Sequence, residues 1–187
     1  MDGVRDQRDT DQATLLLVLN ATPIIYICKA GLAGKLSELR PSFRLLTTKE
    51  VYEEVYVKGI EKGVREASGL KELFDQGIVE VRSPREGSKK VKDFSQSSGI
   101  HSGEASVISL ALELTATAIL DDRRARQVAR VMGVRLSGTP GIVIELVTRR
   151  AISKEEARRS LEKIVEEGWY CSVKIFSIIV KAIEGEA

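Results

Sequence analysis

The chain has 187 residues, of which 43% are hydrophobic and 30% charged, and its 29 Lys and Arg against 27 Asp and Glu leave a formal net charge of +2. The apolar share is too high and Pro too scarce for a disordered, collagen-like or mucin-like chain, and no apolar run reaches the roughly 18 residues of a membrane span. We therefore expect a polar N-terminal tail, 1–13, followed by one globular domain, 14–185, whose length can bury a core without disulfides.

Histidine and cysteine are too few for several common kinds of site. Cys28 and Cys171 have no metal-ligand spacing, and His101 is the single histidine, so zinc sites built on two or three histidines are excluded. We expect any hydrolytic chemistry to depend on carboxylates. The N-terminus is polar and mixed in charge, unlike a signal peptide, which predicts a cytoplasmic protein with no membrane partner.

Short apolar or alternating runs predict strands over 15–19, 78–83, 117–120 and 134–138. The run at 15–19, LLLVL, is apolar throughout, as expected of a strand buried on both faces of a parallel sheet. Capping residues predict helix starts between the strands, at Thr22-Pro23, Thr47, Ser102, Thr139-Pro140 and Ser153. Further helices are expected over about 61–75, 123–132 and 172–184. Strands that alternate with helices predict an α/β fold with a mostly parallel sheet.

Oxygen-bearing side chains follow two of these strands. LLLVL runs into Asn20, and TAIL (117–120) runs into Asp121 and Asp122. Glu54 and Glu104 lie near the starts of two predicted helices. Ligands of open α/β sheets bind beyond the carboxyl ends of the strands, so these side chains are candidates for one common site. Taken singly, each acid also has a purely structural interpretation, as a helix cap or as a partner of the helix dipole.

Carboxylates that converge repel one another unless a cation lies between them. A hard divalent ion with oxygen ligands, Mg²⁺ or Mn²⁺, is the natural occupant of such a site. These ions support phosphodiester hydrolysis without any histidine, which suits this chain.

A helix predicted after Asp122 carries a basic stripe made of Arg123, Arg126 and Arg130. A stripe directly after candidate metal ligands could hold a phosphate backbone near the site, although a plain solvated helix face has the same pattern. The loop lysines Lys89, Lys90 and Lys92 are a second candidate contact. Aromatic residues make up only 5% of the chain, so base stacking and sequence-specific readout are not indicated.

Several segments together resemble the PIN-domain family, most closely its archaeal and bacterial branch related to toxin-type endoribonucleases. They are LNATPIIYICKAG, VYEEV, SGEASVISLALE and LDDRRARQVARVMGV, followed by SGTPGIVIELV. The resemblance covers roughly residues 15–175. It implies a three-layer α/β/α sandwich with a mostly parallel central sheet and a Mg²⁺- or Mn²⁺-dependent ribonuclease acting on single-stranded RNA. It also implies a homodimer and a toxin role with a small antitoxin protein as partner.

The resemblance also implies the site residues, position by position. Glu54 matches the acid on the second helix, Glu104 matches the acid of the GEA turn, and Asp122 matches the later strand-end acid. Asp121 is its neighbour or co-ligand, and Thr22 matches a small hydroxyl residue two places after the first acid.

The first acid itself is replaced, because Asn20 stands where the family has Asp. An amide offers an oxygen but no charge and no basicity, so metal binding should be weaker. Asp121 or Glu53 could supply the missing charge, or activity could be low, or the chain could be a catalytically inactive module that binds RNA or a protein partner. A Rossmann-like phosphotransfer or receiver domain fits less well, since it normally has Asp directly after the first strand.

Overall fold

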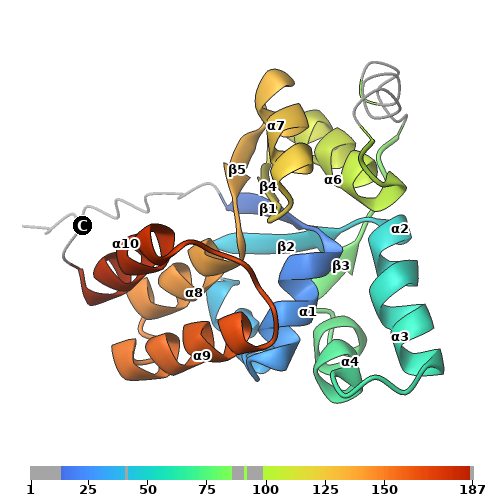
Figure 1. Cartoon of the computed structure of the whole chain (residues 1–187). Helices are drawn as coiled ribbons and strands as arrows, with labels where there is room; N and C mark the ends of the chain where they lie inside the picture. Colours follow the sequence, from blue (N-terminus) through green and yellow to red (C-terminus); the bar gives the residue numbers. More distant parts are fainter. Residues whose placement is uncertain (1–13, 41, 86–90, 92–98, 186–187) are drawn as a thin grey trace, which may run out of the picture.

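The computed structural model describes residues 14–40, 42–85, 91 and 99–185. At the centre of the fold is a five-stranded sheet (Figure 1). The strands are β1 (Leu15–Leu19), β2 (Phe43–Thr47), β3 (Val79–Val81), β4 (Thr117–Ile119) and β5 (Arg135–Ser137). They lie in the order β3-β2-β1-β4-β5, and each neighbouring pair is parallel. The predicted parallel α/β architecture is confirmed.

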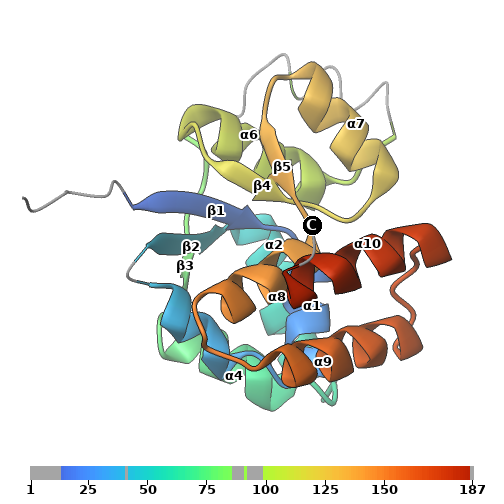
Figure 2. The ribbon, with the colours of Figure 1, turned by 90° about the vertical axis from the view of Figure 1, so that its left-hand side faces the viewer.

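Helices cover both faces of the sheet. They are α1 (Ala21–Lys29), the 3₁₀ helix η1 (Gly34–Leu39), α2 (Lys49–Tyr52), the π-helical turn η2 (Glu53–Val57), α3 (Lys58–Glu61), α4 (Ala67–Asp75), α6 (Ser102–Glu113), α7 (Arg123–Val131), α8 (Thr139–Thr148), α9 (Lys154–Glu166) and α10 (Val173–Glu184). In Figure 2, α6 and α7 lie above the sheet, and α1, α8, α9 and α10 lie below it, which completes the predicted α/β/α sandwich. Of the helices in the described ranges, none has the length and apolar character needed to span a bilayer.

β1 is the central strand, and its apolar sequence follows from this position. Val18 and Leu19 have no exposed surface, because helices cover both faces and strands flank both edges. Val18 lies opposite Leu46 of β2 and Ala118 of β4, both of which are also fully buried. The carboxyl end of β1 therefore lies in the middle of the sheet edge.

Helix starts differ from the predicted ones by one or two residues, and β2 was missed altogether. α1 begins at Ala21, so Thr22 lies inside its first turn. Thr47 is the last residue of β2, and Thr48 instead caps α2 by accepting a hydrogen bond from Val51 N at 3.4 Å. Ser153 caps α9 as predicted, accepting from Glu156 N at 3.0 Å.

Two more helices have other N-cap residues than the predicted ones. The N-cap of α6 is His101, and the N-cap of α8 is Gly138. Ser102 and Thr139 are therefore the first residues of these two helices. The predicted tail, 1–13, and the loop lysines Lys89, Lys90 and Lys92 lie outside the described residues.

Arg126 of α7 holds the ends of two strands. Its Nη1 donates to the carbonyl oxygen of Leu120 at 2.7 Å and to that of Ser137 at 2.8 Å, where β4 and β5 end. Arg123 and Arg130, on the same helix, are exposed. Nη1 of Arg126 is therefore used within the fold, and contact of the three arginines with a phosphate backbone stays a prediction.

Replacing Arg126 with Gln removes the donor shared by these two carbonyl groups. We expect Arg126→Gln to lower the free energy of unfolding by about 1.5–3 kcal/mol, the range for hydrogen bonds to a charged group. Arg123→Gln on the same helix should change it by less than about 0.5 kcal/mol. Urea denaturation followed by circular dichroism measures both, and equal losses in the two variants would contradict this assignment.

Candidate active site

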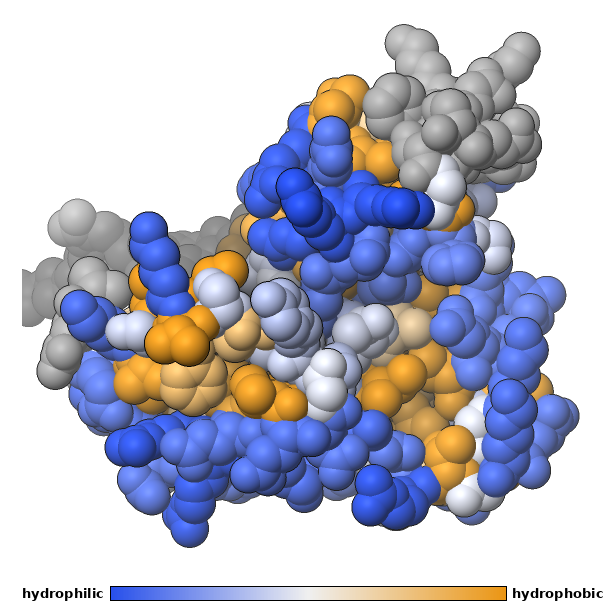
Figure 3. Space-filling view, in the orientation of Figure 1, coloured by the Kyte–Doolittle hydropathy of each residue, from blue (hydrophilic) through white to orange (hydrophobic). Residues whose placement is uncertain are grey.

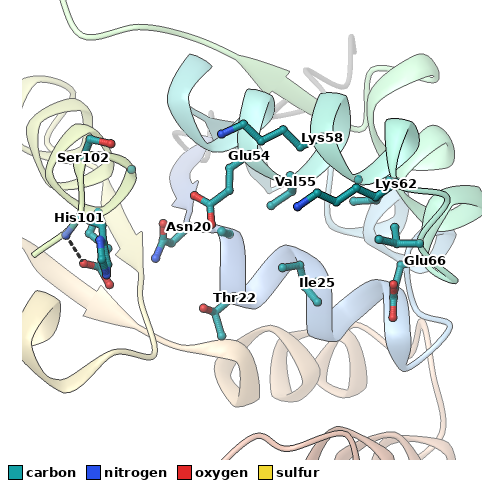
Figure 4. Close-up of a pocket in the computed structure, with 16 residues that line it drawn as sticks. Asn20, Thr22, Ile25, Glu54, Val55, Lys58, Lys62, Glu66, His101 and Ser102 are labelled. Atoms are coloured by element: carbon teal, nitrogen blue, oxygen red, sulfur yellow. Dashed lines mark hydrogen bonds between the residues drawn. The ribbon is translucent and has the colours of Figure 1, made fainter.

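A cavity of about 740 Å³ opens where β1 ends (Figure 4). Four parts of the chain form its walls: the start of α1, the continuous helical segment from η2 through α3, the segment that leads into α4, and the start of α6. The candidate residues Asn20, Thr22, Glu54 and Glu104 all line it. The structure thus brings together four predicted site residues from three segments that are far apart in the sequence.

Asn20 is fixed at the floor of the cavity by its backbone. Its N–H donates to Ile119 O at 3.1 Å, and the residue is only 5% exposed. Its side chain makes no hydrogen bond to any described residue. Asn20 lines the cavity, where its side chain lies next to that of Glu54 (Figure 4). A buried amide in this position is available to a ligand.

Glu54 lies beside Asn20, and Gly103 makes room for both. Glu54 belongs to η2, and π-helical turns of this kind are frequent at functional sites. A Cβ atom on Gly103 would lie 3.5 Å from Glu54 Oε2 and 3.9 Å from Asn20 Oδ1. Figure 4 shows the two side chains next to each other above the start of α1. The neighbouring Glu53 turns away and pairs with Lys49 at 3.6 Å, so it does not replace the missing charge.

Glu104 approaches from the other wall. Its Oε2 accepts a hydrogen bond from His101 N at 2.9 Å, which holds the carboxylate at the start of α6. Burial raises the pKa of Glu104, and the negative charges of Asp122 and Glu54 raise it further, against the lowering effect of the His101 N–H. Asp122 and Glu54 are therefore each close enough to act on the charge of Glu104.

The two aspartates after β4 have different surroundings. Asp122 caps α7 by accepting from Ala125 N at 2.9 Å, and its charge acts on Glu104. Asp121 is engaged by Thr139, whose N–H donates to Oδ1 at 2.9 Å and whose hydroxyl donates to Oδ2 at 2.5 Å. Burial raises the pKa of Asp121, and these hydrogen bonds oppose the rise. Neither aspartate lines the cavity, although Asp122 is close to its acidic edge.

Two buried threonines connect the segments that form the walls of the cavity. The Thr47 hydroxyl donates to Leu19 O at 2.7 Å, and the Thr48 hydroxyl lies 2.7 Å from that of Ser106 on α6. Ser106 in turn donates to Gly103 O at 2.8 Å. The sequence analysis did not identify this connection, since Thr47 was expected to be a helix cap.

The donor set fits a hard divalent cation. Asn20, Glu54 and Glu104 supply one amide and two carboxylate groups, and oxygen donors of this type suit Mg²⁺ or Mn²⁺. Within the described ranges, no three His, Cys, Asp or Glu side chains are grouped closely enough to hold a metal ion alone. Mg²⁺ commonly keeps several waters and takes only one or two protein carboxylates, so such a group is not required.

Two lysines also line the cavity, and the sequence analysis missed them. Lys58 and Lys62 follow Glu54 at four and eight residues along the same helical segment. This spacing was the available signal, because it predicts a shared helix face. Arg123 and Arg130 do not line the cavity.

The fold is a parallel α/β/α sandwich, and oxygen-bearing side chains lie at the carboxyl ends of its central strands. A family model described as a PIN domain, DUF3368, matches residues 16–185. The chain therefore belongs to the PIN-domain family, and the resemblance noted in the sequence is confirmed. PIN domains generally use divalent metal ions. A comparison with curated proteins found no match.

The raised pKa of Glu104 predicts a pH-dependent effect on stability. The folded protein binds this proton more tightly than the unfolded chain, so ionisation of Glu104 destabilises the fold as pH rises through the usual glutamate range to the raised pKa. Glu104→Gln removes the charge and keeps an oxygen for the His101 N–H. Without divalent ions, we expect the variant to be more stable than the wild type at about pH 7, with the difference shrinking toward about pH 4.

Thermal denaturation at several pH values in EDTA measures this difference. Mn²⁺ provides the control, since it should raise the Tm of the wild type more than that of Glu104→Gln. A variant that is less stable than the wild type at pH 7 in EDTA would show that burial and the neighbouring acids do not disfavour the charge of Glu104.

Proposed function

We propose that the protein is a metal-dependent endoribonuclease that hydrolyses phosphodiester bonds of single-stranded RNA. The main support is Asn20, a 5% exposed residue whose amide has no hydrogen-bond partner among the described residues and faces a cavity shared with Glu54 and Glu104. An amide at the floor of the cavity that makes no hydrogen bond to a described residue, beside the carboxylates of Glu54 and Glu104, suits a bound cation. Membership of the PIN-domain family supports the same conclusion.

We assign a separate role to each of the polar residues of the cavity. Asn20, Glu54 and Glu104 would hold Mg²⁺ or Mn²⁺, with Asp122 adding negative charge beside Glu104. When bound, the ion lowers the pKa of a water molecule and balances charge on the phosphate. Thr22 contributes a hydroxyl to the same wall. We assign no metal contact to Asp121, because Thr139 holds both of its oxygens.

Glu104 also has the chemistry of a proton acceptor. Its carboxylate lines the cavity beside the other residues that would hold the ion. Oε2 is held by the His101 N–H, which leaves Oε1 to accept a proton from an attacking water.

The second candidate function is a catalytically inactive module that binds RNA or a protein. Asn20 favours it, because an amide in the first position lowers the negative charge available to a cation. In either case we propose a protein partner, as a small antitoxin or a second copy of the chain. Hydrophobic side chains gather over α10 (Figure 3), where Val173 and Ile178 are exposed next to Tyr170, and such surfaces are commonly covered by a partner. A cytoplasmic location stays a prediction.

Cleavage of labelled single-stranded RNA tests the enzyme directly. We expect Mn²⁺-dependent cleavage by the wild type and a loss of at least about 100-fold in Glu104→Gln, because a proton acceptor and a metal ligand are both removed. Glu53→Gln is the matched control, since this acid lies outside the cavity, and it should keep its activity. RNA that is retained by the wild type but never cleaved would favour the binding module instead.

Asn20→Asp tests whether the missing charge limits the site. The added carboxylate should tighten Mn²⁺ binding and raise the cleavage rate severalfold, since hard-cation affinity rises with ligand charge. In EDTA the same change should lower the Tm, because it adds a charge beside Glu54. Equal metal affinity in variant and wild type would remove Asn20 from the proposed metal site.

Gly103→Ala separates a blocked site from a damaged fold. The new methyl group would meet Val51 Cγ2 at 3.4 Å and Glu54 Oε2 at 3.5 Å, which are ordinary contacts. The free energy of unfolding should stay the same or rise by up to about 1 kcal/mol, as for Gly→Ala in a helix. Cleavage should fall on the order of 10- to 100-fold, because the methyl group displaces ligands between Glu54 and Asn20. Full activity in this variant would contradict the site.

A further inference from the structure

The cavity continues beyond its acidic edge, along α1 and α3. Ile25 and Val55 form part of this second half, and Lys58 and Lys62 extend from the helical segment above it (Figure 4). The cavity therefore has an acidic end and a basic side, joined by an apolar surface.

Neither lysine is neutralised by a described residue. Lys58 and Lys62 are exposed, and in the part of the chain that the structure describes neither forms an ion pair. Glu54 precedes Lys58 by four residues, the usual spacing of a helical pair. The π-helical turn η2 lies between them and changes this register. Lys49 and Glu53, at the same spacing but beginning in α2, do pair at 3.6 Å.

The acid at the far end of the cavity is already paired. Glu66 is mostly buried and lies 3.8 Å from the ammonium of Lys29. Lys58 and Lys62 therefore dominate the charge of this half of the cavity, among the residues that the structure describes.

This arrangement suits a polyanion that must approach an acidic site. Glu54 and Glu104 repel phosphate groups, so affinity for a nucleic acid strand has to come from cations next to them. Lys58 and Lys62 line the same cavity, whereas Arg123 and Arg130 do not and Arg126 is bound to strand carbonyls. The apolar surface of Ile25 and Val55 can receive a sugar or a base.

We propose that Lys58 and Lys62 bind backbone phosphates of the RNA on one side of the cleaved bond. The strand then enters the site along α3 and not over α7. The class of substrate rests on the function proposed above, but the path of the strand rests on the two lysines alone.

Salt-dependent binding tests this path without any cleavage. The probe is a fluorescein-labelled single-stranded RNA of mixed sequence in EDTA, and fluorescence anisotropy gives Kd over a series of KCl concentrations. Each phosphate contact contributes about 0.7 to the slope of log K against log salt for single strands. Lys58→Gln with Lys62→Gln should lower the slope by about 1.4 and weaken binding on the order of tenfold at 0.1 M KCl.

Arg123→Gln with Arg130→Gln is the matched control, as it removes two exposed charges of the same sign from α7. We expect it to leave the slope unchanged. Thermal denaturation of both double variants should give the Tm of the wild type, since all four side chains are exposed.

The outcomes distinguish the path of the strand from the catalytic function. A slope that is unchanged in the lysine variant, equal losses in both variants, or no RNA binding by the wild type overturns the proposed path. If the wild type cleaves RNA in Mn²⁺ but binding does not depend on the lysines, the proposed ribonuclease activity is supported and the proposed path of the strand is wrong. If binding depends on the lysines but the wild type does not cleave RNA in Mn²⁺, the proposed path is supported and the proposed ribonuclease activity is wrong.

Discussion

A short chain of buried hydroxyl groups holds the walls of the site together. Ser106 donates its single hydroxyl proton to Gly103 O, so the Thr48 hydroxyl must donate to Ser106, and Thr48 then accepts from Val51 N. Thr47, one residue earlier, donates to Leu19 O at the end of β1. Three segments distant in sequence are thereby fixed against one another, and each of them carries one candidate ligand. Because buried hydrogen bonds of this kind have no water to replace them, the arrangement is expected to be rigid.

This rigidity explains how the site can hold repelling charges. Glu104 is half-buried near Asp122 and Glu54, and its raised pKa records the unfavourable free energy of placing its charge there. Asn20 adds no fourth charge, so the protein without metal avoids further repulsion at its most buried position. The same amide lowers the attraction for a cation. Stability of the metal-free fold and affinity for metal therefore depend on Asn20 in opposite directions.

The sequence predicts the parts of the fold and site that depend on local patterns. The apolar run before Asn20 identified β1, and the strand ends identified the rim where Asn20, Glu54 and Glu104 meet. β2 was missed because Arg44 interrupts its short apolar pattern and pairs with Glu80 on the neighbouring strand. Asp121 looks like Asp122 in the sequence, and only the position of Thr139 separates them. Such differences depend on contacts between distant segments, which local patterns do not encode.

The basic residues show the same limit most clearly. Arg123, Arg126 and Arg130 share a helical pattern, yet Arg126 reaches two strand carbonyls and stabilises the sheet, while its neighbours remain on the surface. Lys58 and Lys62 share a helix face with Glu54 by their spacing, and they line the cavity because η2 and α3 form one of its walls. A net charge of +2 says little about affinity for a polyanion, since the distance of each cation from the acidic site decides its effect. A lysine that lines the cavity attracts a phosphate group there more strongly than a solvated arginine farther from it, because screening by salt grows with distance.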